Sequence, residues 1–131
     1  MVSSGTLDVQ GAVTGTGTDT ISVAATLEFG STVASGQTVG FTGAGGTLDL
    51  GDPQGFSGKI GGFDTVGSDD TLEIAGLWTS IGFSENGALT QGTLTLTNGA
   101  SHVSLSLLGD YAAAGFIHQP GPGGSTLVTY G

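Results

Sequence analysis

The chain has 131 residues, of which 27 are glycine and 37% are hydrophobic, and it contains no cysteine. This length supports one domain over residues 1–131, and the lack of cysteine excludes disulfides and thiolate metal sites. Eleven acidic residues against one basic residue give a formal net charge of −10. Such a charge repels phosphate backbones, so we expect no nucleic-acid partner. The sequence has no apolar run of about 18 residues, which predicts no membrane insertion.

A four-residue pattern, Thr-Leu-acidic-apolar, recurs along the chain. Its copies begin at Thr6, Thr26, Thr47 and Thr71, and a fifth copy at Thr93 carries threonine in the acidic position. The copies follow one another at intervals of 20 to 24 residues. Repeats of this length are typical of solenoids, in which each turn of chain buries its apolar face by stacking on its neighbours.

A second apolar series lies between these copies and has the same period. Alternation such as Leu48-Asp49-Leu50 predicts short strands with apolar side chains inside and polar ones outside. Glycine-containing pairs such as Asn98-Gly99 predict corners between the strands. The fold that we expect is all-β, a single-domain parallel β-solenoid (β-helix or β-roll) of about six coils. A β-sandwich is the alternative, because short alternating strands with glycine turns also suit it. The second series consists of Ile21, Val39, Ile60, Ile81 and Val103.

Stacking of the repeats predicts two columns of side chains. Like charges stacked on the outside repel by up to about 1 kcal/mol for each exposed pair, and a bound cation would relieve that repulsion. The predicted inner column is a ladder of Leu7, Leu27, Leu48, Leu72 and Leu94, and the predicted outer column is made of Asp8, Glu28, Asp49 and Glu73.

The last part of the chain, residues 108–131, departs from the period. A solenoid needs an atypical terminal unit to cover the open end of its core, so we interpret this segment as a cap. Tyr111, Phe116 and Tyr130 would supply its bulk, and the alanines at 112–114 suggest a short helical turn beginning at Tyr111.

One stretch of sequence resembles a known class of module. It comprises the run 92–99 (GTLTLTNG), Leu107-Leu108-Gly109-Asp110-Tyr111, Phe116 and the run 123–128, with 56–63 and 70–74 upstream. These segments resemble the β-repeat modules of very large secreted proteobacterial proteins, the adhesin-like and haemolysin-type calcium-binding repeat proteins. The resemblance implies an extracellular structural or adhesive module, exported by type I secretion or within an autotransporter passenger. It implies no catalytic residues.

Calcium is the one cofactor that the sequence suggests. The stretch 14–22 matches the calcium nonapeptide of β-rolls except at its first glycine, and in that motif the aspartate binds calcium between successive turns. Asp19 holds the aspartate position, and Asp69 and Asp70 lie in a weaker copy further on. These three residues are the candidate calcium ligands, although a glycine-rich turn without metal explains the same pattern.

Other chemistry is less well supported by the residues. Asp64, Asp69, Asp70 and Glu73 form the densest acidic cluster, which a carbohydrate-active β-helix could use as acid and base. A solvated acidic corner is the simpler interpretation. His102 and His118 are the only histidines, and no Gly-x-Ser-x-Gly elbow occurs. Stacked threonines suggest ice binding, but the interleaved carboxylates hydrate strongly, and β-propensity explains the threonines.

The function that we expect is therefore that of a non-catalytic structural or adhesive repeat module, located outside the cell or on its surface. Calcium-stabilised, ice-binding and carbohydrate-active modules are the alternatives. The expected partners are a surface glycan or other copies of the chain that stack on its open ends.

Overall fold

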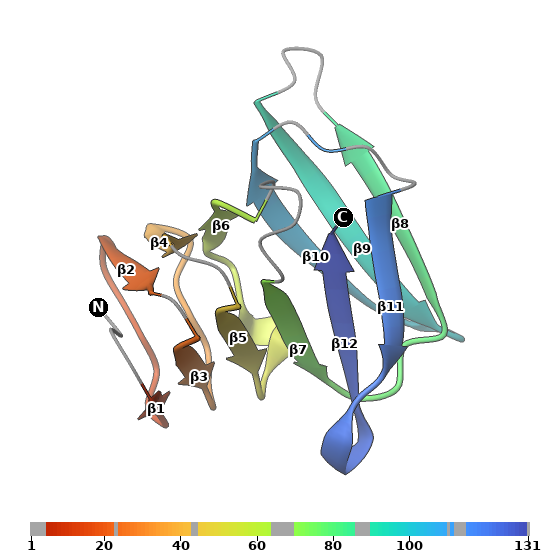
Figure 1. Cartoon of the computed structure of the whole chain (residues 1–131), viewed down its shortest axis with the longest axis horizontal. Coiled ribbons are helices and arrows are strands. Elements are labelled where there is room, and N and C mark those ends of the chain that lie inside the picture. Colours follow the sequence, from red (N-terminus) through yellow and green to blue (C-terminus); the bar gives the residue numbers. More distant parts are fainter. Residues whose placement is uncertain are drawn as a thin grey trace.

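The structure, a computed structural model, describes residues 5–22, 24–42, 45–63, 70–85, 90–109, 111 and 115–130. In these ranges it contains twelve strands and two short 3-10 turns, Pro53–Gly55 and Pro122–Gly124, and no α-helix. The strands form two six-stranded sheets that face each other across the core (Figure 1). The predicted all-β class is therefore confirmed, and the two sheets are each of mixed strand direction.

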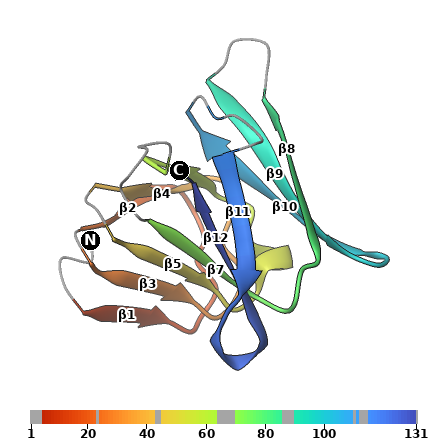
Figure 2. The same ribbon diagram turned by 45° about the vertical axis from the view of Figure 1, so that its right-hand side comes forward.

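The first sheet contains the four Thr-Leu-acidic-apolar copies as neighbouring parallel strands, which Figure 2 shows side by side. A hairpin from the end of the chain then continues the sheet in antiparallel pairing. In spatial order the strands are β1 (Thr6–Val9), β3 (Thr26–Phe29), β5 (Thr47–Leu50), β7 (Thr71–Ala75), β12 (Ser125–Tyr130) and β11 (Phe116–Pro120).

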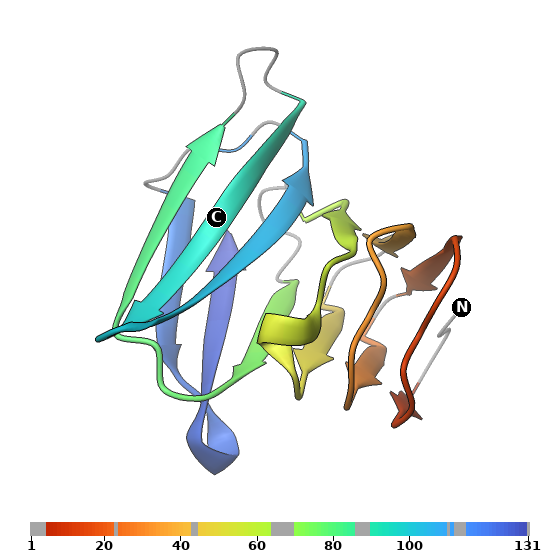
Figure 3. The same cartoon turned by 180° about the vertical axis from the view of Figure 1, so that it is seen from behind.

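The second sheet has the same plan, with four parallel strands followed by two antiparallel ones. Its three longest strands lie on the near side in Figure 3. In spatial order the strands are β2 (Gly17–Ile21), β4 (Gln37–Phe41), β6 (Lys59–Gly61), β10 (Ser101–Leu108), β9 (Gln91–Asn98) and β8 (Ser80–Glu85).

The inner leucine ladder forms in the predicted register across β1, β3, β5 and β7. Leu27 pairs with Leu7 on one side and with Leu48 on the other, and Leu48 pairs with Leu72. Leu48 and Leu72 are completely buried, whereas Leu7 is 44% exposed. This difference arises because β1 is the outermost strand of the sheet and has a neighbour on only one side.

Two corner glycines allow successive repeats to approach closely. A Cβ atom at Gly36 would lie 2.7 Å from the carbonyl oxygen of Gly15, and one at Gly58 would lie 2.8 Å from that of Gln37. Each of these contacts joins a corner to the preceding repeat. Side chains at these positions would push the repeats apart, so glycine is required there by close approach rather than by an unusual φ.

The stack of repeats is shorter than the sequence predicts. The fifth copy, which begins at Thr93, lies in β9 of the second sheet and pairs antiparallel with β8 and β10. Leu94 is buried, but it does not extend the leucine ladder of the first sheet, and Ile81 lies in the edge strand β8 rather than beside β6. The expectation of about six coils is wrong in extent, because each sheet turns to antiparallel pairing after four strands.

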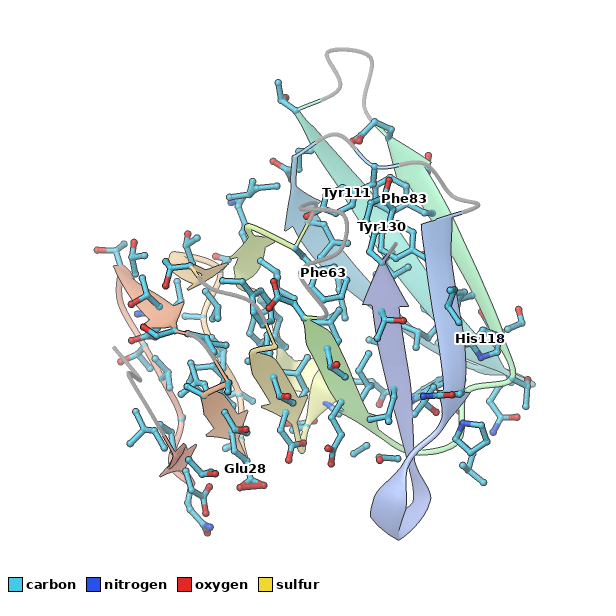
Figure 4. The ribbon with its side chains drawn as sticks, viewed as in Figure 1. Glu28, Phe63, Phe83, Tyr111, His118 and Tyr130 are labelled. Atoms are coloured by element: carbon cyan, nitrogen blue, oxygen red, sulfur yellow. The ribbon has the colours of Figure 1, made fainter. Side chains whose placement is uncertain are left out.

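Aromatic side chains fill the core at the antiparallel end. Phe83, Tyr111, Phe116 and Tyr130 form one cluster, with ring centroids 4.8 to 5.5 Å apart, and three of them carry labels between the sheets in Figure 4. Three of the four are the residues for which the sequence predicts a capping role. The antiparallel strands begin at Ser80, however, well before the predicted cap at residues 108–131. The expected helical turn falls at 112–114, outside the described residues.

Candidate functional site

The predicted column of carboxylates lies on the outer face of the first sheet. Glu28 pairs in register with Asp8 on one side and Asp49 on the other, and Asp49 pairs with Glu73. Glu28, Asp49 and Glu73 each lie between two buried residues of their strand, so their side chains face outward. Figure 4 shows Glu28 on the outside of the molecule. The register thus places four like-charged groups one strand apart, which is about 4.8 Å.

The two middle carboxyl groups of the column, Glu28 and Asp49, have raised pKa values. Burial raises the pKa of Glu28 above its ordinary value, and the charges of Asp49 and Asp8 raise it further. Burial also raises the pKa of Asp49, and the charge of Glu73 adds to that rise, although a hydrogen bond with Glu28 opposes it. The fold therefore favours the protonated forms of Glu28 and Asp49, although both are charged at neutral pH. Either a proton or a bound cation would relieve the unfavourable charge.

The calcium candidates lie in unlike surroundings. Asp19 is half-buried in β2, in register with the completely buried Val39 and hence at an inward position of a strand rather than in a turn. Asp70 is 3% exposed, and its Oδ1 accepts a hydrogen bond of 3.0 Å from the backbone N–H of Gly46. Asp69 lies outside the described residues.

Within the described ranges, no three histidine, aspartate or glutamate side chains are grouped so that they could hold a metal ion. A calcium site made of Asp19, Asp69 and Asp70 therefore stays a prediction. Asp70 has a structural role, because its carboxylate holds the backbone of Gly46 at the corner before β5.

The remaining sequence candidates are not brought together. His102 lies on β10 of the second sheet and His118 on β11 of the first. Of the acidic cluster, Asp64 and Asp69 fall outside the described residues, and Glu73 belongs to the carboxylate column. The threonines that begin β1, β3, β5 and β7 do pair in a column, but each repeat contributes a single threonine to it, beside a carboxylate.

A site that sequence reasoning missed lies at the antiparallel end, where the segment 76–79 joins β7 to β8. We call it the Trp78 hollow. It has a volume of about 320 Å³ and a mostly apolar surface. Its lining comes from the linker and from the β11–β12 hairpin, and consists of Leu77, Trp78, Thr79, His118, Pro120 and Thr126. His118 is half-buried on the edge strand β11, and its pairing with the completely buried Val128 places it on the inner face of the sheet.

Hydrogen bonds fix the linker to the hairpin. The Oγ1 of Thr126 accepts a bond of 2.9 Å from the backbone N–H of Trp78 and donates one of 2.8 Å to the carbonyl of Gly76. The indole Nε1 of Trp78 donates a bond of 2.9 Å to the carbonyl of Ala75. Gly76 has φ +98, and a Cβ there would lie 3.2 Å from that Nε1, so glycine permits the ring to fold back over the chain.

The chemistry of the Trp78 hollow suits binding rather than catalysis. The half-buried indole packs against the core on one side and lines the hollow on another. Leu77 beside it is 55% exposed. Among the described residues, the lining contains one titratable side chain, His118, and no carboxylate. The only signal of this site in the sequence is the single tryptophan, Trp78, two residues after Gly76, at a position where the repeat pattern predicts nothing.

Two other hollows have a different character. One, of about 300 Å³, is lined by the turn 53–58 and by β10, including His102, and its surface is mostly polar. Another lies between β8 and β9 and includes Glu85, whose Oε1 accepts a hydrogen bond of 2.8 Å from the backbone N–H of Tyr111. Phe56 lines the first hollow, but its side chain is only 4% exposed and belongs to the core, and the described lining of the second contains no aromatic residue.

Comparison of the sequence with protein-family models and with curated proteins finds no match. In the part of the chain that the structure describes, no helix is long and apolar enough to cross a membrane.

Proposed function

We propose that this chain is a non-catalytic structural and adhesive module of a secreted or cell-surface protein. In this proposal the parallel strands form a short β-solenoid, and the two antiparallel hairpins close one of its ends. The observation that carries the proposal is the in-register pairing of four copies of one tetrad, with leucine inside and carboxylate outside. Stacked repeats of this kind serve as spacers and extended binding surfaces in other proteins.

The placement of the polar groups also favours a non-catalytic role. General acid–base catalysis needs a titratable side chain within hydrogen-bond reach of a reacting group, usually with a partner that orients it. The two histidines lie in different sheets, and the carboxylates of the column neighbour other carboxylates. The acidic coat suits a module that must stay soluble and resist self-association outside the cell.

Adhesion can be tested directly with immobilised protein. Beads coated with the chain should be retained on surfaces coated with matrix polysaccharide, whereas beads that carry the unfolded Leu48→Asp variant should wash off. An antibody against the chain should find it in the culture medium or on the cell surface. A cytoplasmic location, or equal retention of both kinds of bead, would contradict the proposal.

The carboxylate column supports a second candidate, a calcium-stabilised repeat module. Burial, and after it the charges of neighbouring carboxylates, raises the pKa values of Glu28 and Asp49, and a divalent cation would neutralise that negative charge. Calcium should then raise the melting temperature of the native chain and EDTA should lower it, and the double variant Glu28→Gln, Asp49→Asn should lose that response. Identical melting curves in calcium and in EDTA would remove this candidate.

A further inference from the structure

We propose that the Trp78 hollow binds a sugar ring of a neutral glycan. The inference rests on the proposed adhesive function and names the class of ligand. The linker 76–79 reaches the hollow by passing below the ends of β12 and β11 (Figure 1), so the site lies at the antiparallel end, far along both sheets from the open strand β1.

The aromatic face of Trp78 is the part of the side chain that remains for a ligand. Its backbone N–H donates to Thr126 and its indole N–H donates to the carbonyl of Ala75. Both donors are therefore used within the chain, and these bonds also hold the ring in one orientation. A rigid ring whose face carries partial negative charge suits the C–H groups on one side of a pyranose ring. Because the ring is fixed beforehand, binding costs little conformational entropy.

Polar groups form a rim beside that aromatic face. The imidazole of His118 offers a donor or an acceptor from each ring nitrogen. The hydroxyl of Thr79 donates to the carbonyl of Thr97 at 3.2 Å, and so retains its capacity as an acceptor. An apolar face with a few polar groups at its edge is the usual composition of a small-molecule site. Sugars present the matching combination of an apolar ring face and peripheral hydroxyl groups.

The charge of the site and of the chain favours neutral sugars over charged ligands. The lining has no lysine or arginine to pair with a uronate or sialate, and the formal net charge of −10 repels anions. The part of the lining that the structure describes has no carboxylate either, so a cationic side chain would gain only a cation–π contact with Trp78 there. A volume of about 320 Å³ is at the small end of ligand sites, which fits one or two sugar units of a longer chain.

Tryptophan fluorescence reports binding at this site directly, because Trp78 is the only tryptophan in the chain. We would titrate the protein with cellotetraose, maltotetraose, xylotetraose, mannotetraose and chitotetraose and follow tryptophan fluorescence, with calorimetry as a second readout. At least one of these should change the emission saturably, at millimolar concentration or below. Tetragalacturonate and a polyproline decamer should bind at least tenfold more weakly than that sugar.

Variants then assign the binding to the hollow. By calorimetry, Trp78→Ala should weaken the affinity at least tenfold, and His118→Ala should weaken it about threefold to tenfold. Trp78→Phe keeps a smaller ring and should lie between Trp78→Ala and the native chain. Ile117→Ala is the matched control, because Ile117 is 55% exposed on β11 but does not line the hollow, and it should bind normally. Circular dichroism confirms that each variant is folded.

Three results would overturn the inference. The first is that no neutral tetrasaccharide binds. The second is that the folded Trp78→Ala and Trp78→Phe variants bind as tightly as the native chain, and the third is that the uronate or the polyproline peptide binds more tightly than the neutral sugars. The bead assay separates this outcome from failure of the adhesive function. Beads that adhere equally with native and Trp78→Ala protein would leave adhesion standing and exclude the hollow as its site.

Discussion

The parallel and antiparallel parts of the molecule share the same two sheets but close their core by different means. In the parallel part, one residue type repeats at each level, so that Leu27, Leu48 and Leu72 pack on one another in register. In the antiparallel part, four different aromatic residues from separate elements meet in one cluster. Repetition defines the register but leaves the outermost strand, β1, without a neighbour on one side, and Leu7 is 44% exposed there. The hairpins cover the other end with bulky side chains.

The two open edge strands of the parallel part carry acidic residues that discourage further pairing. Asp8 lies on β1, and Asp19 occupies an inward position of β2 where the next strand has Val39. An inward-pointing charge on an edge strand is a known device against edge-to-edge association. Asp19, which the sequence suggests as a calcium ligand, is therefore also explained as protection of this edge. Stacking of copies through the open end stays a prediction, and these charges disfavour it.

The largest expected effect comes from breaking the ladder of the parallel part. Leu48→Asp places a charge where the side chain is completely buried between Leu27 and Leu72. We expect a loss of about 4 kcal/mol or more, enough to unfold the chain. Urea unfolding followed by circular dichroism measures it. The matched control is Leu7→Asp, the same change at the exposed end of the same ladder, with an expected loss below about 1 kcal/mol. Equal losses would contradict the ladder.

The aromatic cluster should be nearly as important as the ladder. Phe116 is 8% exposed and its ring contacts Phe83, Tyr111 and Tyr130. Phe116→Ala should lower the free energy of unfolding by about 3 kcal/mol, because it removes these contacts and leaves a cavity. Ile117→Ala, on the exposed face of the same strand, should change it by about 0.5 kcal/mol or less.

The same variants also test whether the two parts unfold together. Both sheets run through the parallel and the antiparallel part, so one cooperative transition is expected. Tryptophan fluorescence reports the antiparallel part and far-UV circular dichroism reports all strands. If Phe116→Ala separated these two signals into two transitions, the parts would be independent units rather than one domain.

An intermediate effect is expected at the corners of the repeats. Gly36→Ala places a Cβ 2.7 Å from the carbonyl oxygen of Gly15 and from the methyl of Thr16. Because one of these atoms is backbone, the repeats must shift, and we expect a loss of about 1 to 3 kcal/mol in thermal or urea unfolding. Gly11→Ala is the control, since a Cβ there would meet nothing within 4 Å. A stable Gly36→Ala variant would mean that the repeats are not stacked this closely.

The difference between the two parts also decides what could be predicted from the sequence. Repetition is visible in a single sequence, because the period of the tetrads identifies both the ladder and the carboxylate column. The antiparallel part has no such signal, since its contacts join residues such as Phe83 and Phe116 that no period relates. Its local signal was the Asn98-Gly99 pair. This pair predicts a corner of the repeat, whereas Gly99, at φ +62, reverses the chain between the antiparallel strands β9 and β10.

The Trp78 hollow was not predictable for a related reason. Its lining joins the linker 76–79 to a hairpin that is about fifty residues later in the chain, and the contact depends on the hydrogen bonds of one threonine, Thr126. Thr126 is 2% exposed although its neighbours suggest an ordinary strand. Sequence patterns report which face of a strand is buried. They do not report which distant loop a buried hydroxyl will hold.

The smallest expected effect is the pH dependence of the carboxylate column, which has no counterpart in the antiparallel part. The pKa values of Glu28 and Asp49 are raised in the folded chain, so the folded state binds protons more tightly than the unfolded state. The column therefore destabilises the fold at neutral pH. Stability should rise as the pH falls through the raised values, and the gain is complete below the ordinary values of about 4.

Asp49→Asn should remove part of this pH dependence. At neutral pH we expect the variant to be more stable than the native chain by a few tenths of a kcal/mol, a small gain because the column is partly solvated and screened by salt. Asp52→Asn serves as the control, because it removes the same charge outside the column, from a side chain that makes no capping hydrogen bond. Melting curves at pH 7 and pH 4.5 in low salt measure both variants. If Asp49→Asn and Asp52→Asn raised the melting temperature equally at pH 7, general repulsion among the acidic groups would explain the gain. The register of the column then has an energetic role only if Asp49→Asn alone flattens the pH dependence.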